Sequence, residues 1–194
     1  MANIDKSIRV RKLKTGSDTL VLPSQQKGNE GNVGKFYDNY LKEMGFEINS
    51  GRGVDLPGLH IENKTRKRSS KAPHTVGSMT YDNIINTSYK NSTIFDKLQQ
   101  QNRMEYDDNF NSVVEESVYD FRRSEIQAKI EQSYEHGRAL LRQQGAPAKG
   151  TVVGGPYGVF EHKSGNSYAY RIPDSGMQEL KNMAKNRFDE VFSW

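Results

Sequence analysis

The 194-residue chain contains no cysteine. This absence excludes disulfide bonds, cysteine-ligated zinc and a thiol nucleophile. No apolar run approaches the roughly 20 residues of a membrane-spanning helix, and the mean hydropathy is −0.87. The N-terminus is polar and charged, without the apolar stretch of a signal peptide. These absences make the cytoplasm the expected compartment and exclude a membrane partner.

The chain is long enough for one sizeable domain or for two small lobes that share a core. Ten Tyr, eight Phe and one Trp supply large side chains for such a core. The formal net charge is +4 and the sequence pI is about 9.1. A basic balance of this kind fits a polyanionic partner.

One stretch, residues 55–64, reads DLPGLHIENK. Apolar and polar residues alternate after the Pro57-Gly58 turn signal, which predicts a strand. Side chains two apart on a strand share a face, so Glu62 and Lys64 should project together. The turn can fold Asp55 back beside them.

Two carboxylates and an ammonium in one place are a poor core, because buried charge is costly. They suit a site in which Asp55 and Glu62 bind Mg²⁺ and Lys64 steadies the attacking water at a phosphodiester. The same spacing also fits an exposed hairpin with alternating charge.

Two more charged residues lie on expected helices. The apolar spacing from Asn32 predicts a helix that stops near Gly45 and carries Asp38. A short helix should begin at Ser92 and carry Lys97. Asp38 is either a third carboxylate near the metal or a solvated helix residue, and Lys97 alone is typical of a surface lysine.

A dense basic run follows the predicted strand. Beside a phosphodiesterase site it favours contact with DNA phosphates, since lysine and arginine neutralise them. The alternative is a solvated basic loop. The residues beyond Lys64 that would position DNA are Arg66, Lys67, Arg68 and Lys71.

The rest of the chain alternates between strand and helix signals. A long helix should run from Asp120 to Gln144, and Asp174 should cap a last helix. Arg171 ends a strand just before Pro173, where an arginine can reach a guanine edge or simply face solvent. The expected strands are 1–12, 74–79, 113–119 and the hairpin 159–163 with 167–172, and the expected loops are 16–31 and 151–158.

These residues, taken in order, resemble the MutH-type nicking endonucleases of mismatch repair and their restriction-enzyme relatives, within the PD-(D/E)xK nuclease superfamily. The similar segments are GNVGKFYDNYL (Gly31 to Leu41), DLPGLHIENKT (Asp55 to Thr65), STIFDKL (Ser92 to Leu98) and SYAYRIP (Ser167 to Pro173). The resemblance implies that Asp38 joins the metal site, where the family favours glutamate. It also implies that Lys97 is a second active-site lysine and that Arg171 contacts DNA bases.

The chain departs from this family at several points. Asn63 stands where a hydrophobic residue is common, and Glu30 stands where a lysine is expected before the first helix. Against this family we expect the part after the last helix, which serves methylation sensing and partner contact in the repair enzymes, to be short or missing. The resemblance therefore does not imply dependence on a repair partner or recognition of the same methylated site.

The fold class that the resemblance implies is α/β (α+β). Its restriction-endonuclease-like core has a small mixed sheet flanked by helices, and two lobes surround a DNA cleft. Residues 1–110 would form the catalytic lobe, and residues 111–194 would supply the long helix, the DNA-reading hairpin and the C-terminal helix.

The expected function is Mg²⁺-dependent cleavage of double-stranded DNA at a preferred sequence. Mn²⁺ should substitute for Mg²⁺, and no small-molecule cofactor is expected. One active site in a monomer attacks one strand, which favours nicking. The alternatives are a restriction-type dimer that breaks both strands, a non-catalytic DNA-binding protein, and a purely structural or interaction protein.

Overall fold

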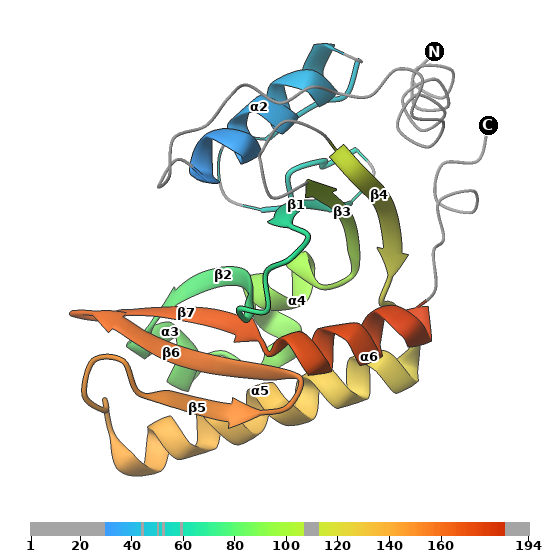
Figure 1. Ribbon diagram of the computed structural model, residues 1–194. Helices are drawn as coiled ribbons and strands as arrows, with labels where there is room; N and C mark the ends of the chain where they lie inside the picture. The colour runs from blue at the N-terminus through green and yellow to red at the C-terminus, as the bar shows by residue number, and fades with distance from the viewer. Residues whose placement is uncertain are drawn as a thin grey trace. The chain divides into compact units, whose positions relative to one another are not determined.

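The computed structural model describes residues 30–106 and 113–184, apart from Met44, Ser50, Arg52 and Leu59. Within them the chain forms two compact units (Figure 1). Unit 1 comprises residues 30–70 and 100–120, and unit 2 comprises residues 71–99 and 121–184. Segments of the two units alternate along the chain. The expected functional split at residue 110 stays a prediction. The expected strand 1–12 and most of the expected loop 16–31 lie outside the described residues.

Unit 1 is a three-stranded mixed sheet with one helix, α2 (Glu30–Glu43). The strand order is β1 (Glu62–Lys67), β3 (Gln100–Tyr106) and β4 (Val113–Asp120). Strand β1 runs parallel to β3, and β3 runs antiparallel to β4. Helix α2 packs against β1 (Figure 1). Its buried residues Tyr37 and Leu41 fit the helical apolar spacing.

The central strand β3 is unusually polar for a buried strand. Its sequence is QQNRMEY, and Gln100, Gln101, Asn102 and Arg103 are all buried. Such a strand shows no alternation of apolar and polar residues, and for that reason the sequence did not reveal it. Backbone pairing on both sides satisfies its peptide groups, while its side chains need polar partners of their own.

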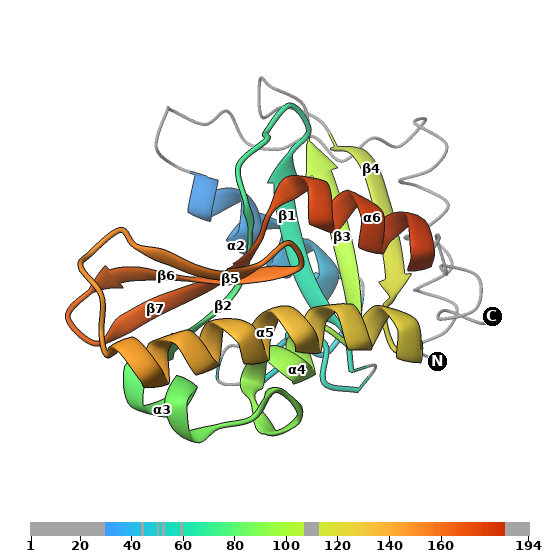
Figure 2. The same cartoon turned by 90° about the horizontal axis from the view of Figure 1, so that it is seen from below.

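Unit 2 is built on an antiparallel sheet of four strands. Their order is β2 (His74–Thr80), β7 (Ser167–Ile172), β6 (Gly158–Ser164) and β5 (Val152–Gly155). Helix α5 (Ser124–Gln144) packs against β5 and β6 and runs along the sheet in Figure 2. The other helices are α3 (Tyr81–Asn86), the 3₁₀ helix η1 (Tyr89–Asn91), α4 (Thr93–Lys97) and α6 (Asp174–Ala184).

An aromatic cluster forms the core of unit 2. The ring of Tyr134, on α5, lies 5.1 Å from that of Phe160 and 5.4 Å from that of Tyr89, between centroids. The Phe160 and Tyr170 ring centroids are 5.0 Å apart, with an angle of 65° between the ring planes. Edge-to-face pairs of this kind add stabilisation beyond buried area. The cluster joins α5 and η1 to β6 and β7.

Most of the sequence-predicted elements are confirmed. The first helix, the strand after the Pro57-Gly58 turn and the small mixed sheet all occur in unit 1, in an α+β fold. Ser92 caps α4, and its Oγ accepts a hydrogen bond from the Phe95 backbone at 3.1 Å. The hairpin β6–β7 and the last helix also occur. No helix in the described part of the chain is long and apolar enough to cross a bilayer.

Three expectations about local structure were wrong or incomplete. The expected loop 151–158 contains strand β5, which pairs antiparallel with β6. Only a short turn connects the two strands. The long helix begins at Ser124, because β4 continues to Asp120. Helix α3, helix η1 and strand β3 had no counterpart among the expected elements. Strand β3 depends on pairing with β1 and β4, which local sequence patterns do not encode.

Gly137 on α5 provides a test of the packing in unit 2. A Cβ there would lie 2.9 Å from Phe160 Cδ2 and 3.0 Å from the Val153 carbonyl oxygen. Alanine normally stabilises a helix interior relative to glycine. We expect Gly137→Ala to destabilise instead, by about 1–3 kcal/mol in urea unfolding, because the site is already filled. The exposed Gln132→Ala on the same helix should change stability by less than about 0.5 kcal/mol. A stabilised Gly137→Ala would contradict this packing.

Candidate active site

Strand β1 carries a carboxylate and an ammonium on one face. Lys64 Nζ donates a hydrogen bond to Glu62 Oε1 at 2.5 Å. The Glu62 side chain is 1% exposed, and that of Lys64 is 23% exposed. Because an unpaired buried carboxylate is costly, the Lys64 ammonium allows Glu62 to stay inside the protein. The two side chains share a face, as the strand period predicted.

Asp55 is folded back against the same strand. Leu56 and Ile61 form an isolated antiparallel bridge around the Pro57-Gly58 turn, with Leu56 N donating to Ile61 O at 2.8 Å. Asp55 Oδ2 then accepts a hydrogen bond from the backbone N–H of Asn63 at 2.9 Å. The turn therefore brings the Asp55 carboxylate against the backbone of β1 at Asn63, which is the residue between Glu62 and Lys64.

Helix α2 contributes Asp38 to the same region. Asn63 Nδ2 donates to Asp38 Oδ1 at 3.4 Å. Asp38 is partly buried, so it is not the fully solvated helix residue of the alternative interpretation. A single residue of β1, Asn63, thus contacts both Asp38 and Asp55.

The electrostatics show that these carboxylates influence one another. Burial, followed by the nearby Glu62 charge, raises the pKa of Asp55 to about 6. Burial also raises the pKa of Asp38, with the Asn63 hydrogen bond opposing it and the Glu62 charge adding to it. Lys64 lowers the pKa of both groups. A bound cation would relieve the mutual repulsion of the carboxylates.

Asp55 and Glu62 are the two carboxylates of the site that could serve as ligands of a divalent cation. In the described part of the chain, no three His, Asp or Glu side chains form a group that could hold a metal ion. The three expected ligands Asp38, Asp55 and Glu62 are therefore not assembled as one set. Mg²⁺ commonly binds one or two protein carboxylates and takes its other ligands from water and phosphate. Asp55 and Glu62 would meet that need, and Asp38 as a third ligand stays a prediction.

Strand β3 adds two polar residues that the sequence did not point to. Gln101 pairs in register with Glu62, and Arg103 pairs with Lys64. Residues paired on adjacent strands project to the same side of a sheet. Arg103 NH1 donates to Gln101 Oε1 at 2.6 Å, and both residues are buried. The Arg103 guanidinium is thus a register neighbour of Lys64, because β1 pairs in parallel with β3.

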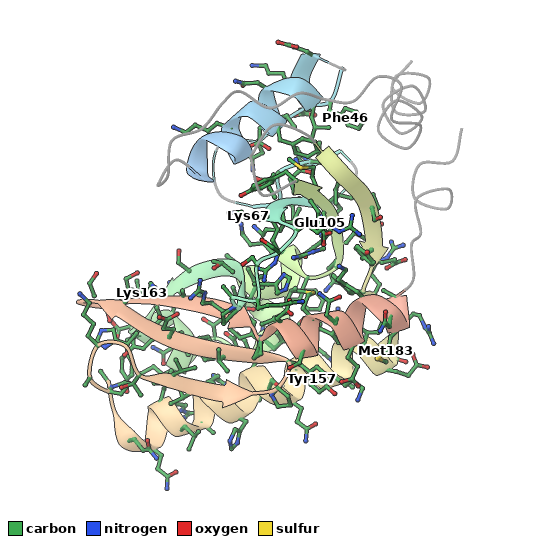
Figure 3. All side chains as sticks on the ribbon, in the orientation of Figure 1. Phe46, Lys67, Glu105, Tyr157, Lys163 and Met183 are labelled. Atoms are coloured by element: carbon green, nitrogen blue, oxygen red, sulfur yellow. The ribbon has the colours of Figure 1, made fainter. Side chains whose placement is uncertain are left out.

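The basic run lies at the end of β1 and in the following turn. Arg66 NH2 donates to the Ser70 carbonyl at 2.9 Å. Arg68 is exposed, with its Nε 4.0 Å from Glu105 Oε2. Figure 3 labels Lys67 and Glu105 on the two neighbouring strands. Lys71 belongs to unit 2, where its Nζ is 4.0 Å from Asp174 Oδ2. Contact of these side chains with DNA phosphates stays a prediction.

Lys97 lies in unit 2, at the end of α4. It is half-buried and packs along β2, because a Cβ on Gly77 would lie 3.3 Å from Lys97 Cδ. It is therefore not the fully exposed lysine of the alternative interpretation. Its role with the unit 1 carboxylates stays a prediction.

Arg171 also lies in unit 2 and is held by two neighbours. Its Nε donates to Thr75 Oγ1 at 3.1 Å, and its NH1 donates to Glu161 Oε2 at 2.9 Å. Burial raises the pKa of Glu161, but the hydrogen bonds from Arg171 and Lys163 outweigh that effect and leave it below its ordinary value. Arg171 of β7 is thereby held by side chains on both neighbouring strands, β2 and β6. Its contact with a base edge stays a prediction.

Comparison of the chain with protein-family models and with curated proteins found no match. The resemblance to PD-(D/E)xK nucleases therefore stays a prediction from the quoted segments.

The raised pKa of Asp55 generates a stability test. An unfolded aspartate titrates near 3.9, so the folded metal-free protein holds its proton more tightly. Stability should fall as pH rises from about 4 to about 6, and the full penalty should persist above 6. Asp55→Asn should therefore stabilise the metal-free protein at pH 8, by about 1–2 kcal/mol after allowance for partial exposure, and not at pH 4.

Urea unfolding at pH 4 and pH 8 without divalent cations measures this difference. Glu47→Gln, at an exposed side chain outside the site, is the matched control and should show no such dependence. Equal stability of wild type and Asp55→Asn at pH 8 would contradict the expectation that burial and the Glu62 charge disfavour the ionised Asp55 carboxylate.

Proposed function

We propose that this chain is an Mg²⁺-dependent endonuclease that cleaves duplex DNA at a preferred sequence. The observation that carries the proposal is the Lys64–Glu62 pair on β1, with Asp55 folded against the same strand. A nearly buried carboxylate, a paired lysine and a second carboxylate of raised pKa are typical of a functional site rather than of a hairpin with alternating charge.

Each residue has a specific task in this proposal. Asp55 and Glu62 would hold Mg²⁺, with Asp38 assisting. The bound ion supplies Lewis-acid polarisation of the phosphate and a more acidic water. Lys64 has three N–H donors, and the bond to Glu62 uses one of them. The others would orient the attacking water and a phosphate oxygen, with Lys97 supporting the phosphate.

The fold supports the proposal at a coarse level. The mixed sheet with α2 packed against β1 is compatible with the restriction-endonuclease-like core that the sequence predicts. The two lobes around a DNA cleft, which the resemblance implies, are part of this proposal. Arg66, Lys67, Arg68 and Lys71 would contact phosphates, and Arg171 would read a base edge.

A non-catalytic DNA-binding protein is the second candidate. In this candidate the basic residues of β1 and the following turn would contact phosphates, and the Glu62–Lys64 pair would be a structural ion pair only. Salt-dependent DNA binding without cleavage in Mg²⁺ or Mn²⁺ would support it over the nuclease.

Removal of either a metal ligand or the active-site lysine should separate DNA cleavage from DNA binding. We expect Asp55→Ala and Lys64→Ala each to slow cleavage of supercoiled plasmid by roughly a hundredfold or more, while DNA affinity stays largely intact. Plasmid conversion with Mg²⁺ and a gel-shift titration without it measure the two properties. Lys42→Ala, at an exposed lysine of α2, is the control and should cut at the wild-type rate. If both site variants cut as fast as wild type, the assignment is wrong.

The nuclease should nick rather than break both strands, because a monomer offers one active site. Supercoiled plasmid should accumulate as open circles before any linear product forms, and mapping of the 5′ ends should place the nicks at a preferred sequence. Direct conversion of supercoiled to linear DNA would instead support a restriction-type dimer.

A further inference from the structure

Asn63 lies between Glu62 and Lys64 in sequence and is 6% exposed. Its side chain projects from the opposite face of β1, because successive residues of a strand alternate. Burying a primary amide is unfavourable unless its donors and acceptor find partners. The partners of Asn63 therefore show what its burial achieves.

Asn63 holds both of the carboxylates that come from outside β1. Its backbone N–H donates to Asp55 Oδ2 at 2.9 Å, and its side-chain Nδ2 donates to Asp38 Oδ1 at 3.4 Å. One carboxylate precedes the Pro57-Gly58 turn and the other lies on α2. No other described residue is hydrogen-bonded to both in the contacts that the structure defines.

A hydrogen bond from Asn102 fixes the orientation of the Asn63 side-chain amide. Asn102, its register partner on β3, donates from Nδ2 to Asn63 Oδ1 at 3.2 Å and to Tyr37 Oη at 3.0 Å. An ionised carboxylate only accepts hydrogen bonds, so the Asn63 amino group must face Asp38. The Asn63 side-chain oxygen must then accept from Asn102. Donation therefore runs from Asn102 to Asn63 and from Asn63 to Asp38.

This network is poorly suited to stability alone. Asn102 is fully buried, and its Oδ1 has no hydrogen-bond partner among the described residues. An unsatisfied buried acceptor destabilises a fold, and replacing both partners of a buried hydrogen bond by apolar groups is often neutral or stabilising. The amide pair is better explained by what it orients than by the stability that it adds.

We propose that Asn63, held by Asn102, is a positioning residue that fixes Asp38 relative to Asp55 for cation binding. Asn102 is in turn hydrogen-bonded to Tyr37. The inference rests on the proposed function, since it assigns the network a role only if the carboxylates bind a divalent ion. It also explains how a helix residue reaches the site without belonging to a preassembled group of three ligands. This role gives a physical reason for an asparagine at position 63, where the nucleases that the sequence resembles commonly have a hydrophobic residue.

The test is a thermodynamic cycle on Mn²⁺ affinity, measured by calorimetry with the full chain and no DNA. We expect Asn63→Leu to weaken binding by about 10- to 100-fold, the usual effect of removing a group that orients a metal ligand. In an Asp38→Asn background the same substitution should weaken it much less, because the two changes interrupt one interaction. Thr65→Val, on the same strand face, is the matched control and should bind as wild type does.

Thermal unfolding distinguishes positioning from a structural role. The double variant Asn63→Leu with Asn102→Leu should unfold at a temperature equal to or above that of Asn63→Leu alone, although it binds Mn²⁺ as weakly. Should Asn63→Leu fail to fold, Asn102→Leu provides the same cycle with Asp38→Asn, since it removes the donor that holds the Asn63 oxygen.

Full additivity of the cycle, with Mn²⁺ binding intact in the wild type, would overturn the role of Asn63 and leave the proposed function standing. A wild-type protein that binds no Mn²⁺ and cuts no DNA would overturn both.

Discussion

The ion pair between Glu62 and Lys64 is the constraint on which the candidate site depends. A carboxylate that is almost fully buried must be paired, protonated or bound to a cation, since an isolated buried charge is very unfavourable. Strand geometry provides the partner without a loop or a second element, because Lys64 is two residues away on the same face. The Asp55 carboxylate then lies beside an already charged neighbour, and its raised pKa is the consequence.

The polar central strand extends this constraint across the sheet. Gln101, Asn102 and Arg103 occupy positions that an ordinary three-stranded sheet would fill with valine or isoleucine. One face of β3 meets Glu62 and Lys64 in register, and the other meets Asn63. Unit 1 therefore has polar side chains on both sides of its middle strand. Its buried apolar residues come from α2, from the segment around the Pro57-Gly58 turn, and from Met104, Tyr106 and Val118 of β3 and β4.

Unit 2 has the opposite character. Its core is aromatic, its sheet is antiparallel, and helix α5 packs so closely that Gly137 leaves no room for a methyl group. Its core also contains polar contacts, such as the Tyr89 hydroxyl, which donates to Gln127 Oε1 at 2.8 Å. Tyr157, labelled in Figure 3, donates to Glu179 of α6 at 2.7 Å, and Lys129 stacks on its ring. Arg171 is likewise anchored by Glu161 rather than free to adopt any direction.

Local chemistry in the sequence determined helix α2, the Ser92 cap of α4, the β6–β7 hairpin and the shared face of Glu62 and Lys64. Each follows from a repeat period, a capping side chain or a turn dipeptide within a few residues. The sequence also placed Asp55 beside β1, because a Pro-Gly turn reverses the chain there. Strands β3 and β5 lacked such signals, one being polar and buried and the other rich in glycine.

Only the tertiary structure decided that Asn63 contacts Asp38, that Asn102 holds Asn63, and that Arg103 neighbours Lys64. These contacts join residues that are far apart in sequence, and they depend on a parallel strand pair whose register no local pattern encodes. Burial then sets the charge state of Asp55, because removal from water acts on a side chain only after distant segments have packed around it.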